Sequence, residues 1–291
     1  MAIGDFHLHS NASDGVHTPS WVMETAHANG VHTLSLTDHD TTDGYAEAQA
    51  AAERLGLRLI PGIELSADLE LKALGVKADI HLLGFGIDIT RPELQRQLRA
   101  YREGRIERVH KTVAILADQG AVISVERVFE IAGEASVGRP HVARALVEAG
   151  HVASVQEAFD RWLGNNKVAD VQREKLEPKD AIRMVHEAGG VVFAAHPVFI
   201  TEKYEPVLDE LASWGEDAID GIETYYKHYD AQSVAYHRHI ADRLGLATSG
   251  GNAYHGLGNP DDRAIGDVPF PDHEVERFVA YLEAKGARTG A

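Results

Sequence analysis

Short β-rich segments alternate with helical segments along most of this 291-residue chain, and this alternation constrains the fold more than any other feature. A helix between two strands brings the second strand back parallel to the first through a right-handed crossover. Seven segments have the β-rich character: 5–9, 31–37, 57–64, 80–85, 191–197, 219–226 and 246–249. The sequence therefore predicts an α/β fold with about seven parallel strands.

Histidines and acids follow or end one predicted strand after another. They are His7, His9, His39, Glu64, His196 and His255. In a closed barrel the loops after the carboxyl ends of the strands build the functional site. Candidate ligands at so many strand ends therefore favour a distorted seven-stranded, TIM-like barrel over an open sheet.

A helical stretch of about 80 residues interrupts the alternation after Thr90. We expect a discontinuous barrel of residues 1–95 and 179–291, with residues 96–178 as an inserted helical subdomain that covers the site. Near the amino terminus, Thr18 followed by Pro19 predicts the start of the first helix.

Composition limits the chemistry of any metal site. The chain has 17 histidines and no cysteine, so a metal must be held by nitrogen and oxygen atoms. The net charge of −17 argues against binding long duplex nucleic acid, but it does not exclude an anionic substrate that meets metal ions in a pocket. Because we find neither a signal peptide nor an apolar stretch that could cross a bilayer, we expect a cytoplasmic protein with no membrane partner.

Alternate residues of a strand share a face, so His7 and His9 are predicted to point the same way while Phe6 and Leu8 face a core. Several buried imidazoles and carboxylates on one rim are costly unless a compensating charge is present. Divalent Zn, Mn or Fe ions supply that charge and accept this donor set. Each residue also has an ordinary alternative: Asp14 could cap a turn, for example.

Taken together, six short motifs resemble those of the PHP (polymerase and histidinol phosphatase) family of metal-dependent phosphoesterases. The motifs are His7-Leu8-His9, Ser13-Asp14-Gly15, Thr37-Asp38-His39-Asp40, Gly62-Ile63-Glu64, Ala195-His196-Pro197 and Tyr254-His255-Gly256. The resemblance extends from residue 3 to about residue 256. It implies a distorted barrel of about seven strands with a trinuclear centre, and we expect two or three divalent ions.

The resemblance also implies how the ligands divide. The ligands carried over are His7, His9 and Glu64 for the first metal, Glu64, His81 and His196 for the second, and Asp14, His39 and His255 for the third.

One position departs from the family pattern. The family has an aspartate ligand of the first metal two residues before the last histidine, and this chain has Ala253 there. Either the first metal is held weakly by fewer ligands, or this is a variant from which the acid was removed. The sequence leaves both explanations open.

The helix after Pro92 is positively charged in a chain that is negatively charged as a whole, since positions 91 to 111 hold seven basic residues and three acidic ones. Arg105 lies on its apolar stripe, and an arginine that faces inward needs a fixed anion such as a substrate phosphate. Arg96, Arg99 and Arg108 are expected to be solvated and ion-paired. The candidate phosphate-binding residues are Arg102, Arg105, Arg139, His141 and Lys167.

The helical insertion resembles that of one branch of the family, which hydrolyses nucleotide phosphates, including the 3′-phosphate of nucleoside 3′,5′-bisphosphates. Some relatives trim short RNAs from the 5′ end. The hypothesis is attack by a metal-bound hydroxide. His196 or His255 could protonate the leaving oxygen only if that residue is not fully engaged as a metal ligand, and this role is left open. Tyr225, Tyr226 and His228 are candidates for stacking on a base, although rim packing explains them as well.

Three other functions are weighed against this one. They are a phosphatase for a small ester such as histidinol phosphate, a nucleotide-binding module with little turnover because of Ala253, and an amidohydrolase. The helical insertion counts against the small ester, which needs no such cover over the site. Arginines that face inward count against the amidohydrolase, because its reaction does not require them.

Overall fold

The computed structural model describes residues 3–133, 135–164, 167–171, 176–258 and 263–290. Its seven strands follow one another around a single sheet in chain order. They are β1 (Gly4–Leu8), β2 (Thr33–Leu36), β3 (Arg58–Leu71), β4 (Val76–Phe85), β5 (Val191–Ala194), β6 (Gly221–Tyr226) and β7 (Ala247–Gly251). The last strand returns to the first, because Gly251 packs against His7 and an isolated bridge pairs Leu8 with Tyr254. The sheet is therefore a nearly closed barrel, as the sequence predicted.

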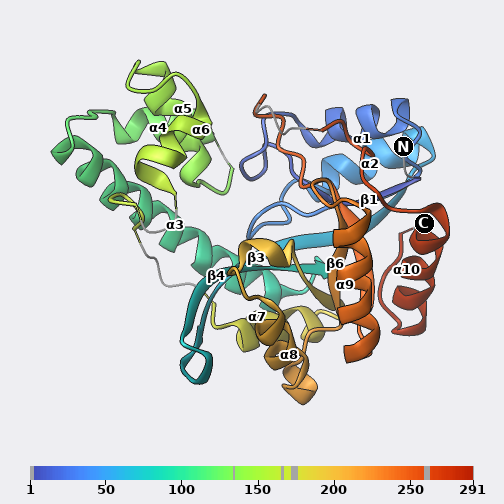
Figure 1. The fold of residues 1–291 in the computed structure, drawn as a ribbon. Helices are drawn as coiled ribbons and strands as arrows, with labels where there is room; N and C mark the ends of the chain where they lie inside the picture. The colour runs from blue at the N-terminus through green and yellow to red at the C-terminus, as the bar shows by residue number, and fades with distance from the viewer. Residues whose placement is uncertain (1–2, 134, 165–166, 172–175, 259–262, 291) are drawn as a thin grey trace.

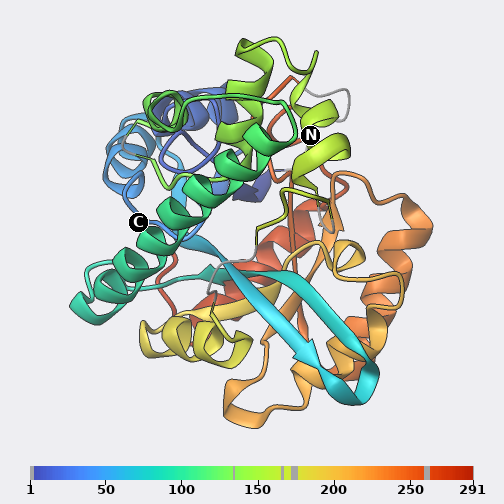
Figure 2. The same ribbon diagram turned by 90° about the vertical axis from the view of Figure 1, so that its left-hand side faces the viewer.

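The prediction that all strands are parallel was wrong for β4, which runs antiparallel to both β3 and β5. Residues 72–75 alone join β3 to β4, and strands joined by so short a turn must be antiparallel. The signal was present in the sequence, since residues 66–71 alternate polar and apolar side chains, as a half-exposed strand does. The resulting hairpin projects from the body of the molecule (Figure 1, Figure 2).

The sequence pattern predicts helices that begin at Thr18 and Pro92, helices over 45–55, 125–131, 141–149, 155–163, 178–188 and 231–244, and a closing helix, and most of the observed helices lie close to these positions. They are α1 (Pro19–Ala28), α2 (Tyr45–Leu55), α3 (Pro92–Asp118), α4 (Val125–Ala132), α5 (Arg139–Glu148), α6 (Val155–Ala158), α7 (Pro178–Glu187), α8 (Glu205–Ala212), α9 (Ala231–Leu244) and α10 (Asp272–Ala284). The side chain of Thr18 accepts the Trp21 N–H at 3.2 Å, which confirms the predicted start of α1. Helix α8 was not anticipated. No helix among the described residues combines the length and hydrophobicity needed to cross a bilayer.

Helices α3 to α6, drawn in green, gather on one side of the molecule (Figure 1). The carboxyl half of α3 shares an apolar core with α4 to α6, which includes Val109, Leu116, Val128 and Leu146. Leu94 and Leu98, from the amino half of α3, pack instead in a core with barrel residues. One helix thus connects the barrel to the helical cluster, and the division at residues 96 and 178 stays a prediction.

Aromatic side chains fill part of the barrel interior. Phe278 of α10 lies 4.5 Å from Phe6 of β1 and about equally far, 5.1 and 5.5 Å, from Phe85 of β4 and Phe193 of β5, measured between ring centroids. These rings are 0–1% exposed, and burial of each stabilises the fold by about 1.5–3 kcal/mol. The packing confirms that Phe6 faces a core, whereas Leu8 lies in a second core with residues of α1 and α2, because the pairing of β1 with β2 is irregular between Asp5 and Leu8.

Candidate metal centre

The structure brings all eight predicted ligands together. They form three groups whose ligand atoms lie within 4.8 Å of one another: His7, Glu64 and His196; His39, Glu64 and His81; and His9, Asp14, His39 and His255. They come from β1, β3 and β4 and from the segments that follow β1, β2, β5 and β7. The grouping differs from the one implied by the resemblance, since His9 joins Asp14, His39 and His255.

Glu64 is the centre of this arrangement. Its Oε2 atom lies 3.1 Å from Nε2 of both His7 and His9, and its Oε1 atom lies 2.8 Å from His81 Nδ1. Burial alone would raise the pKa of Glu64, but the neighbouring histidines, His39 first among them, hold that pKa well below its usual value. The carboxylate is therefore ionised, and its two oxygens face different imidazoles.

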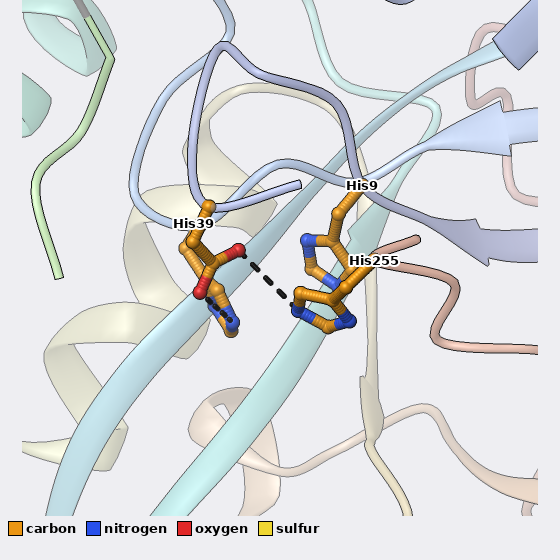
Figure 3. Close-up of side chains that lie close together, drawn as sticks. His9, His39 and His255 are labelled. Atoms are coloured by element: carbon orange, nitrogen blue, oxygen red, sulfur yellow. Dashed lines mark ion pairs between the residues drawn. The ribbon is translucent and has the colours of Figure 1, made fainter. Parts of the chain in front are cut away.

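Asp14 organises the third group. Its carboxylate oxygens lie 3.8 Å from His39 Nε2 and 3.3 Å from His255 Nε2. The ring of His255 also stacks on that of His9, with 4.1 Å between centroids. Figure 3 shows His9, His39 and His255 directed toward one another, with the two ion pairs drawn as dashed lines. One carboxylate thus faces imidazoles from three different segments.

The nitrogen and oxygen atoms of the cluster are arranged better for binding a metal than for hydrogen bonding to one another. Both ring nitrogens of His9 are buried, and neither makes a hydrogen bond within the described residues, although Nε2 lies 3.1 Å from Glu64. The distance is short but the alignment is poor, so a cation between the two groups satisfies both better than a shared proton. Burial and the nearby His255 also hold the pKa of His9 well below its usual value. The ring is therefore neutral, as a metal ligand must be.

Further buried acids support these residues, and sequence reasoning missed their role. Asp38 accepts hydrogen bonds from Ser10 N–H at 2.8 Å and from the Ser13 hydroxyl at 2.6 Å, so it fixes the loop that carries Asp14. Burial raises the pKa of Asp38 to about 6, although these donors oppose the shift. Glu223 on β6 contacts His7 and the backbone of His196. An acid inside an otherwise uncharged strand was the available signal for it.

A cavity of about 290 Å³ opens above the ligand cluster, lined by His7, Asp14, His39, Glu64, His81, His196 and His255 among others. Arg105, Arg108, Arg139 and Lys227 also line it, against three acids, Asp14, Glu64 and Asp79. In a chain of net charge −17, four fixed cations in one cavity are a local reversal. Such a cavity suits an anionic ligand.

The structure gives Arg105 an anion within the chain, and it contradicts the prediction for Arg108. The fixed anion of Arg105 is Asp40, whose Oδ2 atom accepts N–H groups of Arg105 at 2.8 and 2.6 Å. From the sequence we expected a substrate phosphate as the anion of Arg105, because the sequence alone does not reveal that Asp40 lies opposite α3. Arg108 was expected to be solvated, yet it is 9% exposed and lines the cavity. It faces inward because the next turn of α3 continues the buried stripe.

The remaining phosphate-binding candidates differ in position. Arg139 lines the cavity and lies 3.7 Å from Asp79 and 3.5 Å from Asp170. Arg102 pairs with Asp43, and neither it nor exposed Lys167 is among the lining residues. His141 lines a neighbouring cavity, and its Nδ1 atom accepts the Gly138 N–H at 2.9 Å. Burial lowers the pKa of His141 to about 4.

The aromatic candidates separate in the same way. Tyr226 is 5% exposed and lines the cavity, 5.7 Å from the ring of His196. Tyr225 is buried on the other side of β6, where it stacks on Phe270 at 4.9 Å. Tyr226 alone of these two is placed to meet a ligand.

Residues 5–173, more than half of the chain, match the model of the PHP domain. This chain belongs to the PHP domain family. Among its relatives, a 3′,5′-nucleoside bisphosphate phosphatase of Chromobacterium violaceum is 33% identical over 276 residues, which cover 92% of this chain and 93% of the relative. A 5′-3′ exoribonuclease of Haemophilus influenzae is 35% identical over 219 residues, or 74% and 77% of the two chains.

The fold agrees with that membership. A solved structure from Bifidobacterium adolescentis, described as a putative metal-dependent phosphoesterase, superposes with a TM-score of 0.81 at 27% identity and covers 96% of both chains. The predicted family and the predicted barrel are thus confirmed.

Proposed function

We propose that this PHP-family chain is a metal-dependent phosphoesterase that hydrolyses the phosphate monoester of a nucleotide. Nucleoside 3′,5′-bisphosphates, AMP-like nucleotides and the 5′ ends of short RNAs are the candidate substrates. One observation carries the proposal: a single cavity is lined both by the histidines and acids of the ligand cluster and by Arg105, Arg108 and Arg139. Its volume of about 290 Å³ is at the small end for ligand sites, which favours one nucleotide over a duplex.

The donor set suits two or three divalent ions, with Mn, Zn and Fe as the candidates. One ion would be held by His7, Glu64 and His196, a second by Glu64 and His81, and a third by His9, Asp14 and His255. His39 belongs to both of the last two groups and, as a neutral imidazole with one free lone pair, would ligate only one of those ions. A divalent ion at such a site neutralises phosphoryl oxygens and lowers the pKa of water to about 7.

The chain's own residues bind and orient the ester. The planar guanidinium of Arg139 matches the geometry of a phosphate, and the Lys227 ammonium adds charge from the segment after β6. Both ring nitrogens of His255 are engaged, Nε2 with Asp14 and Nδ1 with the Ala253 carbonyl. His196 is likewise assigned to an ion, so neither histidine protonates the leaving oxygen while it serves as a ligand.

The test is phosphate release from adenosine 3′,5′-bisphosphate, AMP and histidinol phosphate, measured with Mn²⁺ and after treatment with EDTA. We expect release from the nucleotides, loss of release with EDTA, and recovery on adding Mn²⁺. Glu64→Gln is the inactive control, because it removes the charge that faces the histidines. Release from histidinol phosphate alone would favour the small-ester phosphatase, and no release from any ester would contradict the proposal.

A nucleotide-binding module with little turnover is the second candidate, and Ala253 favours it. Ala253 lines the cavity and offers no ligand atom from its side chain. Ala253→Asp restores a carboxylate and Ala253→Asn restores only its shape. Tight AMP binding without hydrolysis, converted to hydrolysis by Asp and not by Asn, would establish this candidate. The arginines that line the cavity count against an amidohydrolase.

A further inference from the structure

Glu223 is fully buried on β6 and contacts two candidate ligands at once. Its Oε1 atom lies 2.9 Å from His7 Nδ1, and its Oε2 atom accepts the backbone N–H of His196 at 2.7 Å. We infer that Glu223 is a positioning residue of the metal centre, which keeps the proton of His7 on Nδ1 and holds His196 in its strained backbone conformation. The inference rests on the proposed metal centre and on no particular substrate.

The first half of the argument concerns the His7 ring. Nε2 of His7 faces Glu64 at 3.1 Å, so this nitrogen is the one directed at the ligand cluster. A nitrogen that binds a metal carries no proton, and the proton of a neutral imidazole then lies on the other nitrogen. The Glu223 carboxylate accepts that proton's hydrogen bond. It therefore leaves Nε2 available to the ion.

The second half concerns His196. Its φ of +25° is rare for a residue other than glycine, and such a backbone costs on the order of 1–3 kcal/mol. Glu223 is placed to hold it there, because its second oxygen accepts the His196 N–H. One carboxylate thus contacts two ligands of the same group, His7 through one oxygen and His196 through the other.

Glutamine is a sharp probe because it has the same shape and only one acceptor oxygen. The His196 N–H is a fixed donor, so the amide oxygen turns to it and the amide NH₂ group faces His7. His7 then has to accept at Nδ1, which puts its proton on Nε2 and blocks the metal. If the amide turns the other way, the His196 N–H loses its acceptor. Both orientations weaken metal binding.

The experiment is calorimetric titration of the metal-free full chain with Mn²⁺ alone. We expect Glu223→Gln to weaken the affinity by about 10- to 100-fold while far-UV circular dichroism stays unchanged. Glu274→Gln is the matched control: Glu274 is 2% exposed and lies on α10 with Arg238 and Arg277 as partners. This control keeps the wild-type affinity.

A spectroscopic measurement tests the same inference without a variant. In the zinc-loaded wild-type chain, ¹⁵N resonances of the His7 ring should show the proton on Nδ1. A proton on Nε2, wild-type Mn²⁺ affinity in Glu223→Gln, or the absence of metal binding by the wild-type chain would each overturn the inference. If Glu223→Gln loses metal but the wild type hydrolyses no ester, the inference stands and the proposed function fails.

Discussion

Arg105→Met tests whether the buried pair between α3 and the rim stabilises the fold. The Arg105 side chain is 5% exposed and that of Asp40 is 1% exposed, so both charges lie away from water. Arg105 donates two N–H groups to one oxygen of Asp40, and the other oxygen accepts the Ser66 N–H at 3.0 Å. Removing the guanidinium leaves a buried carboxylate without that counter-charge.

Breaking such a buried pair from one side costs about 3–5 kcal/mol. With a slope of about 3 kcal/mol per M, the midpoint of urea unfolding should fall by about 1–2 M. Circular dichroism at 222 nm measures the transition. Arg96→Met is the matched control on the same helix, because the Arg96 side chain is 69% exposed and its pair with Glu93 lies in water.

The double variant Arg105→Met/Asp40→Asn separates charge from packing. It removes both charges, so the loss should be smaller than the sum of the two single losses by about 1–3 kcal/mol. If Arg105→Met unfolds at the same urea concentration as Arg96→Met, the pair does not stabilise the chain and the reasoning fails.

Three further predictions follow from the same site. Lys227→Met should weaken AMP binding to the Mn²⁺-loaded chain about tenfold, whereas exposed Lys203→Met should not; equal affinities by calorimetry would refute this. The pKa of His141 is about 4 in the folded chain, against an ordinary value of 6.5. Between pH 6.5 and pH 4 the imidazole is therefore protonated in the unfolded chain but not in the folded chain, and the free energy of unfolding falls as the pH drops. The loss from pH 7 to pH 5 is about 2 kcal/mol, and urea midpoints for His141→Gln should lack it. Gly251→Ala would place a Cβ atom 2.5 Å from the His7 backbone nitrogen, so its melting temperature and Mn²⁺ affinity should both fall; unchanged values of both would show that the strands can separate.

The order of strands and helices could be predicted because it depends on local pattern. Alternation of apolar runs with amphipathic segments marked the seven strands, and the step from Thr18 to Pro19 marked a helix start. The direction of β4 was missed because the apolar run ending at Glu64 was taken as a whole strand. In the structure β3 continues to Leu71, and the turn after it reverses the chain.

Six of the candidate ligands could be predicted for the same reason, since each lies on or just after a strand, whereas Asp14 and His81 were implied by the resemblance to the PHP family. The charged residues around the ligands could not be predicted. Glu223, Arg108 and Lys227 are charged side chains whose meaning depends on burial and on partners far along the chain. Glu223 is 216 residues from His7, and no local pattern relates the two. Arg105 shows the same limit, because its position on an apolar stripe predicted an anion but did not identify Asp40.

Glu223, Lys227 and Arg105 have one property in common: each contacts a residue with a strained backbone conformation. Among the described residues, those other than glycine with positive φ are Asp40 (53°), His196 (25°) and Ala253 (47°), and all three lie at the rim. Each is held by a buried charged side chain from elsewhere: Arg105 binds the Asp40 carboxylate, Glu223 accepts the His196 N–H, and Lys227 donates to the Ala253 carbonyl at 3.3 Å. Such conformations cost on the order of 1–3 kcal/mol each and persist where the surroundings over-determine them. The local sequence opposes these three turns and the tertiary charges impose them, so the rim takes its shape only once α3, β6 and the segment after β6 are in place.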